Sequence, residues 1–135
     1  MRAPWRRSIA SLDTKALGDL GERAAARWLR RNRYRVLLRN ETCAVGEADL
    51  IALGPDKRTV VFVEVKTRRA SAVEGERRPE ANITERKRAK LLHVARTISR
   101  DRGWLGRPLR IDVIAVELSD RAAPRVRHYE NAITG

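Results

Sequence analysis

The chain has 135 residues, of which 30 are Lys or Arg and 17 are Asp or Glu, so its formal net charge is +13. This length favours a single domain, and the excess of positive charge predicts a polyanionic partner, most simply nucleic acid, with an anionic membrane surface as the lesser alternative. Aromatic residues make up only 4% of the chain, which argues against a single-strand binder that stacks bases on aromatic side chains.

The N-terminal segment, residues 1–13, is basic at its start and lacks the apolar stretch of a signal peptide. No run in the chain approaches the ~20 apolar residues of a membrane helix. Cys43 is the only cysteine, which excludes an intrachain disulfide and suits a reducing compartment. We therefore expect a cytoplasmic protein with no membrane partner, consisting of a flexible basic tail over residues 1–13 and one domain over residues 14–135.

The first predicted helix runs from about Thr14 to Asn32. It has an apolar stripe on one side and charged residues on the other. Glu22 lies on the border of the stripe, among small residues that would let the helix approach a sheet closely. Taken alone, Glu22 is most simply a boundary glutamate that reaches into water. A first strand over residues 34–38 and a turn over residues 39–41 are expected to follow.

The strongest strand signal covers residues 60–65, which are β-branched and aromatic almost throughout and predict a central strand buried on both faces. Glu64 and Lys66 stand two residues apart at its end, so both side chains leave the same face. Burying either charge alone is costly, which indicates an ionic group beside them. A strand-end ion pair at the surface is the simpler alternative.

A second acidic residue, Asp49, precedes a short apolar run and the turn signal of residues 54–57. A hairpin centred on Asp56 and Lys57 would place Asp49 directly opposite Glu64, with their β-carbons roughly 5 Å apart. Two carboxylates that converge beside a lysine predict a site for a hard divalent cation such as Mg²⁺. The prediction depends on register, because a slip of one residue would send the two carboxylates to opposite faces.

The stretch from Arg68 to Ala81 has no apolar periodicity, so it is either a mobile loop over the substrate or a disordered insertion. Thr84 is a plausible N-cap of a second helix that extends to about Arg102. Four basic residues crowd the first turns of this helix, where they oppose the macrodipole and would favour a bound phosphate, although solvated basic faces are common. They are Arg86, Lys87, Arg88 and Lys90.

Two further strands are expected, a buried one over residues 109–118 and a short edge strand over residues 125–129. Within the first, Asp112 is most simply the partner of Arg110 or of another cation. His93 and His128 lack partners at metal-ligand spacing, which favours surface or packing roles. The order of elements predicts an α/β fold with a mixed central β-sheet flanked by two α-helices.

Six sequence blocks carry a resemblance to a known family. They are Gly18-x-x-Gly21-Glu22-x-x-Ala25, Gly46-Glu47-Ala48-Asp49-Leu50-Ile51, Val61-Phe62-Val63-Glu64-Val65-Lys66-Thr67-Arg68, Thr84-x-x-Lys87, Arg110-Ile111-Asp112-Val113 and His128-Tyr129-Glu130-Asn131-Ala132. With them, the chain resembles the uncharacterised UPF0102, or YraN-like, family from about Leu17 to Ile133. That family has the restriction-endonuclease-like PD-(D/E)xK pattern of archaeal Holliday junction resolvases. The segment of residues 73–83 departs from the family pattern, while the acidic blocks are intact.

The resemblance implies a metal-dependent DNA endonuclease, with branched DNA as one candidate substrate. Its catalytic residues would be Glu22, Asp49, Glu64 and Lys66. Mg²⁺ or Mn²⁺ would be held by Asp49, Glu64 and the carbonyl of Val65. Nucleic acid would contact Arg68 and Arg69 together with the four basic residues at the start of the second helix.

Two alternatives stay open beside this hypothesis. One is a nucleic-acid-binding protein whose carboxylates do no chemistry, and the other is an RNA- or ribosome-associated factor. The complete quartet of three carboxylates and a lysine favours the enzyme, because a pure binder gains little from acidic groups that face phosphates. DNA and RNA, branched and linear substrates, and a monomer and a homodimer are not distinguished at this level.

Overall fold

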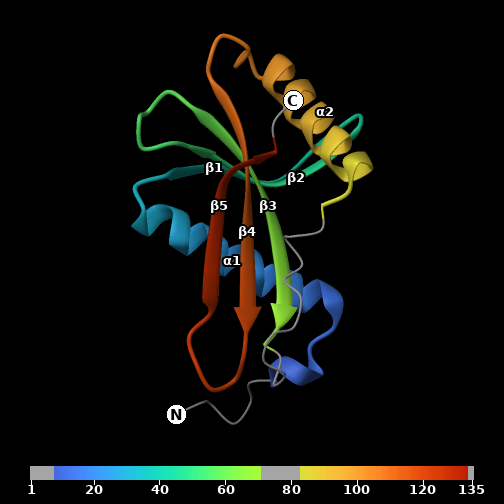
Figure 1. Cartoon of the computed structure of the whole chain (residues 1–135), viewed down its shortest axis with the longest axis vertical. Coiled ribbons are helices and arrows are strands. Elements are labelled where there is room, and N and C mark those ends of the chain that lie inside the picture. Colours follow the sequence, from blue (N-terminus) through green and yellow to red (C-terminus); the bar gives the residue numbers. More distant parts are fainter. Residues whose placement is uncertain (1–7, 71–82, 134–135) are drawn as a thin grey trace.

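The computed structural model describes residues 8–70 and 83–133, which form a single five-stranded sheet with two helices (Figure 1). The strands follow the order β1-β2-β3-β4-β5, and every neighbouring pair is antiparallel except β3 and β4, which are parallel. The predicted mixed sheet flanked by helices is thereby confirmed. In chain order the elements are a 3-10 turn at Ile9–Ser11, α1 at Thr14–Arg31, β1 at Arg35–Cys43, β2 at Gly46–Leu53, β3 at Val60–Arg69, α2 at Glu85–Asp101, β4 at Leu109–Leu118 and β5 at Arg125–Ile133.

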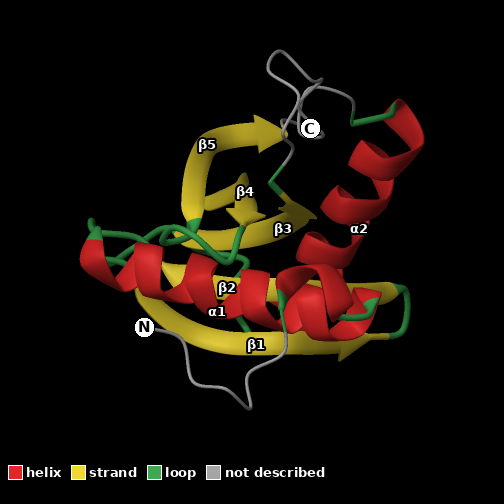
Figure 2. Ribbon diagram, turned by 90° about the horizontal axis from the view of Figure 1, so that it is seen from below, coloured by secondary structure: helices red, strands yellow, loops and turns green. Residues whose placement is uncertain are grey.

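The two helices cover opposite faces of the sheet, and each face has its own core (Figure 2). Alternate residues of β3 show the division, because Val61 and Val63 pack in the cluster under α1 while Val60 and Phe62 pack in the cluster under α2. This follows from the two-residue period of a strand, and it confirms that β3 is buried on both faces. The same period assigns the side chains that follow at even positions on β3 to the face of α2.

Helix α1 begins at an aspartate cap, where Asp13 Oδ1 accepts a hydrogen bond of 2.8 Å from the backbone N–H of Ala16. At its centre the helix lies directly against β3, since a Cβ added at Gly21 would stand 1.8 Å from Oγ1 of Thr67. A side chain at this position would push the helix off the sheet. The expected close approach through small residues is therefore found at Gly21.

The hairpin between β2 and β3 has the expected register. Leu50 pairs with Val63, and Leu53 pairs with Val60 at the other end of the ladder. The turn is held by Asp56, whose Oδ1 accepts hydrogen bonds of 2.9 Å from the backbone N–H groups of Arg58 and Thr59. These bonds and a third from the Thr59 hydroxyl lower the pKa of Asp56 to about 2. Local turn chemistry thus sets the register on which the site depends.

The turn expected at residues 39–41 is wrong. Strand β1 continues through these residues and pairs with β2 as far as Cys43 and Gly46, so the two strands form a long ribbon. The residues with turn character remain within it, and Asn40 has a left-handed φ of 48°. Backbone pairing with β2 on both sides of Asn40 therefore overrides the local preference for a turn.

The tail expected up to residue 13 does not extend through residues 8–13. Ile9 and Leu12 pack against the core under α1, and the backbone N–H of Ile9 donates a hydrogen bond of 3.0 Å to Asp120. Strand β3 is also longer than expected, because it continues through Arg68 and Arg69 beside β4. The remainder of the expected tail, residues 1–7, and most of the expected loop, residues 71–82, lie outside the described residues.

Candidate functional site

The candidate site is where strands β2 and β3 separate. Their ladder ends at the pair of Leu50 and Val63. One residue beyond it, the side chain of Asp49 takes the place of a backbone partner, because its Oδ2 accepts a hydrogen bond of 2.8 Å from the backbone N–H of Val65. This contact fixes the position of the Asp49 carboxylate between the diverging strands.

Asp49 and Glu64 line one hollow of about 320 Å³ between the sheet and α2. Because both side chains line this hollow, they lie on the same face, as predicted. Other parts of the wall come from Glu47 on β2 and from Lys87 and Lys90 on α2. The Glu64 side chain is only 14% exposed, so its charge is poorly solvated.

Two lysines approach the Glu64 carboxylate from different elements. Lys66 Nζ, from β3, lies 3.9 Å from Glu64 Oε1, and Lys87 Nζ, from α2, lies 3.6 Å from the same oxygen. The expected proximity of Glu64 and Lys66 is therefore present. Lys87 had been expected only in the basic cluster that binds phosphate, and the structure brings its ammonium group to the carboxylates as well.

Burial is the largest cause of the pKa shifts of Asp49, Glu64 and Lys66. Burial raises the pKa of Asp49 above its ordinary value, and burial together with the Asp49 charge raises the pKa of Glu64. Burial also lowers the pKa of Lys66, whereas the Glu64 carboxylate raises the pKa of Lys87. The site thus disfavours its own negative charges despite the two lysines, which is the condition in which a further cation is attracted.

Glu22 reaches the neighbourhood of the pair from α1. Burial raises its pKa, and the next cause is the negative charge of Asp49, so the two carboxylates interact. Glu22 nevertheless lines a separate hollow of about 420 Å³ with Asn40 and other residues. Glu47 lines both hollows and connects them. The predicted convergence therefore holds for three of the four residues, with Glu22 in the adjoining space.

Glu47 and Asn40 were not selected from the sequence. Glu47 stands two residues before Asp49 in the same acidic block, and that spacing was the one signal for it. Asn40 was assigned to a turn, but the left-handed residue on β1 brings its side chain into a hydrogen bond with Glu22 that lowers the pKa of that carboxyl.

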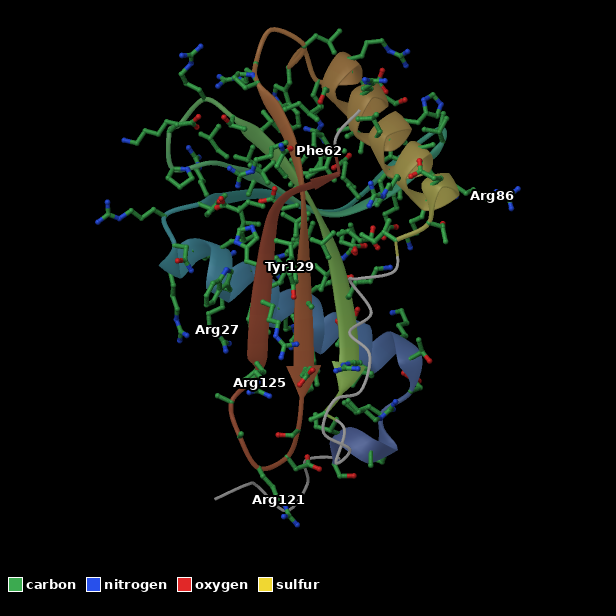
Figure 3. All side chains as sticks on the ribbon, viewed as in Figure 1. Arg27, Phe62, Arg86, Arg121, Arg125 and Tyr129 are labelled. Atoms are coloured by element: carbon green, nitrogen blue, oxygen red, sulfur yellow. The ribbon has the colours of Figure 1, made fainter. Side chains whose placement is uncertain are left out.

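The basic residues expected to contact nucleic acid fall into two groups. Arg68 forms an ion pair of 2.6 Å with Glu117, and the guanidinium of Arg69 donates hydrogen bonds to the carbonyls of Ile9 and Leu12. Both of these arginines hold the fold together. The cluster at the start of α2 is different, because Arg86, Arg88 and Lys90 are exposed, and Figure 3 shows Arg86 directed away from the helix.

The donor set fits a metal ion that retains much of its water. Within residues 8–70 and 83–133, no group of three or more His, Cys, Asp or Glu side chains is close enough to hold a metal ion. Asp49 and Glu64 supply two carboxylates, and Mg²⁺ commonly binds through one or two carboxylates and keeps several waters. The N–H and C=O of a strand residue face the same edge, so the Val65 carbonyl also faces the gap that its N–H shares with Asp49.

A second polar cluster surrounds Asp112, which is 0% exposed. Arg110 donates two hydrogen bonds of 2.9 and 2.8 Å to its carboxylate, which confirms the expected pair. His128 Nε2 lies 2.8 Å from the same carboxylate, and His128 Nδ1 accepts from the indole N–H of Trp28 at 3.2 Å. Burial alone would raise the pKa of Asp112, but the bonds from His128 and Arg110 lower it.

This cluster ties together α1, β4 and β5, and only the pair of Arg110 and Asp112 was expected from the sequence. The cluster also includes Tyr34, whose hydroxyl donates to Glu130 and accepts from Arg110. Tyr34 and His128 are in ring contact, with centroids 5.6 Å apart. His128 therefore has the packing role that was one of its two expected roles, and His93 lies exposed on α2.

The fold and site define an α/β protein with a carboxylate pair at the separation of two strands. The sequence profile of the uncharacterised protein family UPF0102 matches residues 21–116, and the chain belongs to this family. A UPF0102 protein of Geotalea uraniireducens is 38% identical over 126 residues, which cover 93% of this chain and 95% of the relative. Another from Geobacter sulfurreducens is 41% identical over 118 residues, which cover 87% and 88% of the two chains.

Similarity to solved structures is more distant. A repair endonuclease from Pyrococcus abyssi aligns with a TM-score of 0.45 and 14% identity over 81% of this chain and 40% of that chain. Pyrococcus furiosus SfsA, solved in complex with Ca²⁺, aligns with a TM-score of 0.42 and 15% identity over 87% and 64% of the two chains. Neither described helix is long and apolar enough to cross a membrane.

Proposed function

We propose that the protein is a metal-dependent nuclease that hydrolyses phosphodiester bonds of DNA in the hollow between β2, β3 and α2. The observation that carries the proposal is the separation of β2 from β3 at Asp49. It leaves two poorly solvated carboxylates, Asp49 and Glu64, facing an open hollow. The ammonium groups of Lys66 and Lys87 lie 3.9 and 3.6 Å from the Glu64 carboxylate. A fold alone does not dictate an activity, so the proposal rests on these side chains.

Asp49 and Glu64 would hold Mg²⁺ or Mn²⁺, together with the Val65 carbonyl. When bound, such an ion activates water and neutralises the charge that develops on a phosphate. The hydrogen bond from Val65 N–H holds Asp49 Oδ2, so that Oδ1 is the oxygen left to bind an ion. Glu22, in the adjoining hollow, would act on this site through water.

Lys66 and Lys87 would have different roles at the phosphate. Burial lowers the pKa of Lys66, which suits a group that positions or helps to deprotonate the attacking water. Lys87 has its pKa raised by Glu64 and remains a cation, which suits contact with the phosphate. A bound metal would neutralise Glu64 in place of Lys87 and free the Lys87 ammonium for the substrate.

Nucleic acid would enter past the start of α2. Lys90 lines the hollow, and the exposed Arg86 and Arg88 lie on the same first turns of α2. Such a basic rim gathers phosphates and does not read sequence. We propose DNA as the substrate, with branched DNA as the favoured form.

A non-catalytic nucleic-acid-binding role is the second candidate. One observation favours it, because Lys66 and Lys87 already neutralise Glu64 without a metal ion. A binding protein has no use for the desolvated Asp49, however, and Asp49 lines the same hollow.

The deciding experiment is a cleavage assay with purified protein on branched, duplex and single-stranded DNA and RNA, each with EDTA, Mg²⁺ or Mn²⁺. We expect cleavage of DNA that requires the metal and that is absent from a Glu64→Gln preparation purified in the same way. Wild-type protein that cuts none of the substrates with either metal would exclude the nuclease and leave the binding role.

A further inference from the structure

Arginine side chains cover the solvent face of α1, which is a different surface from the carboxylate hollow. All four are exposed, and within residues 8–70 and 83–133 their guanidinium groups have no acidic partner. Three of them, Arg23, Arg27 and Arg31, stand four residues apart and follow one line along the helix, with a rise of about 6 Å per step. These residues, called here the α1 arginine face, are Arg23, Arg27, Arg30 and Arg31.

The α1 arginine face borders a hollow of about 220 Å³ between α1 and the connection from β4 to β5. Arg27, Trp28 and Arg31 line it from α1, and Pro124 and Val126 line it from the other side. The described residues of the wall include no carboxylate. Figure 3 shows Arg27 and Arg125 on one flank of the molecule and Arg86 on the opposite flank.

The floor of this hollow is held in place by the buried cluster of β4 and β5. The Trp28 indole donates to His128 Nδ1 at 3.2 Å, and His128 Nε2 in turn bonds the buried Asp112 at 2.8 Å. Because Nδ1 accepts from Trp28, the ring proton of neutral His128 lies on Nε2 and points at Asp112. The arginines therefore flank a rigid aromatic surface.

Some arginines of the sheet have acidic partners, as Arg68 does with Glu117, Arg110 with Asp112 and Arg127 with Glu117. No such partner is found among the described residues for the α1 arginine face, and like charges at a spacing of four residues destabilise a helix. A polyanion that binds along the helix removes this repulsion. Its charge complements the surface, and its repeated phosphates match a row of guanidinium groups.

We propose that the α1 arginine face, with the hollow at Trp28, binds the phosphodiester backbone of a second nucleic-acid duplex while the rim of α2 holds the first. The inference rests on the proposed function only for the location of that first duplex. DNA of about 10–20 base pairs is far shorter than its persistence length of ~150 base pairs, so one short duplex does not bend around to both flanks. Two duplex arms that meet at a branch supply both segments, which identifies branched nucleic acid as the substrate class.

The test is the stoichiometry of duplex binding per chain, measured by isothermal titration with a duplex of about 12 base pairs in EDTA at low salt. Wild-type protein should bind two duplexes per chain, a ratio that dimerisation does not change. The variant Arg27→Gln/Arg31→Gln should bind one. The variant Arg86→Gln/Arg88→Gln should also bind one, because it loses the other site.

The matched control is Arg96→Gln/Arg100→Gln, which removes the same charge at the same spacing from exposed positions of α2. It should keep two duplexes per chain, and circular dichroism should be unchanged in every variant. A wild-type ratio of one, or equal ratios for the α1 variant and the control, would overturn the proposal. So would α1-dependent binding of phosphatidylserine vesicles without a second duplex, which would mark a membrane-facing surface.

Failure of this inference is distinct from failure of the nuclease. The titration contains no divalent ion and involves no cleavage, so two duplexes bound by a protein that cuts nothing would support the second surface and reject only the nuclease. Metal-dependent cleavage by a protein that binds one duplex would have the opposite meaning.

Discussion

Replacing Glu64 with glutamine should change metal-free binding and catalysis in opposite directions. The substitution keeps the size of the side chain and removes its charge. In the absence of metal, the carboxylate only repels a phosphate that enters the hollow, so Glu64→Gln should bind DNA more tightly than wild type. With Mg²⁺ or Mn²⁺ it should lose cleavage, because one of the two carboxylates that hold the ion is gone.

The size of the binding effect follows from the geometry. A phosphate oxygen about 4 Å from the carboxylate interacts with it by about 1 kcal/mol in water and by about 4 kcal/mol at the effective dielectric of a protein surface. Glu64 is 14% exposed, but Lys66 and Lys87 lie 3.9 and 3.6 Å from it and offset part of its field. We therefore expect the lower figure, about 1 kcal/mol, which corresponds to about a fivefold decrease in Kd.

Fluorescence polarisation with a labelled duplex in EDTA measures this change, and a gel assay with metal measures cleavage. The matched control is Glu41→Gln, which neutralises a carboxylate on β1 that pairs with Arg102 at 3.0 Å. Lys66→Ala should also abolish cleavage but should weaken binding slightly, since a cation near the phosphate is lost. Equal affinities for Glu64→Gln and Glu41→Gln, or full cleavage by Glu64→Gln, would refute the assignment of the site.

Four other predictions concern stability and binding. Burial raises the pKa of Asp49 and Glu64 in the folded protein. Their contribution to stability is therefore complete below their ordinary pKa values of 3.8 and 4.5, and it is lost as the pH rises through their pKa values in the folded state. The variant Asp49→Asn/Glu64→Gln should resist urea better than wild type near pH 7, and this difference should vanish in acid. Asp112→Asn should lower the free energy of unfolding by about 3–5 kcal/mol in urea titrations, because it removes the buried charge that balances the half-buried Arg110 guanidinium. Gly21→Ala should destabilise by about 1–3 kcal/mol through overpacking, whereas Gly18→Ala, where the space is open, should stabilise by about 0.5–1 kcal/mol; equal thermal shifts would contradict the close approach of α1. Affinity for duplex DNA should fall by roughly 0.9 log units per log unit of salt for each phosphate neutralised, and a flat response would show that the excess charge is not used on a polyanion.

The local features of the site were predictable from the sequence because they depend on residues close together in the chain. The turn at Asp56 and the two-residue period of a strand were enough to place Asp49 and Glu64 on one face. Thr84 was likewise recognised as the cap of α2, and its hydroxyl accepts a hydrogen bond from the backbone N–H of Lys87. Each of these predictions rests on a few consecutive residues, for which local geometry is decisive.

Where a local preference for a turn or loop competed with strand pairing, strand pairing determined the structure. The turn residues around Asn40 became part of β1 because β2 offered backbone partners on both sides of Asn40. Arg68 and Arg69 looked like the start of a substrate loop, yet β4 supplied partners that keep them in β3. A single-sequence pattern contains no information on a neighbouring strand that lies far along the chain.

The contacts that only the tertiary structure decided join residues distant in sequence. Lys87 reaches Glu64 because α2 packs against β2 and β4, the strands on either side of β3, and Trp28 meets His128 because α1 packs against β5. The sequence by itself determined which elements form and which faces their charged residues occupy, since these follow from short-range periodicity and capping. The tertiary structure decided which of those charges meet, because helix docking and strand order are set by the packing of the whole core.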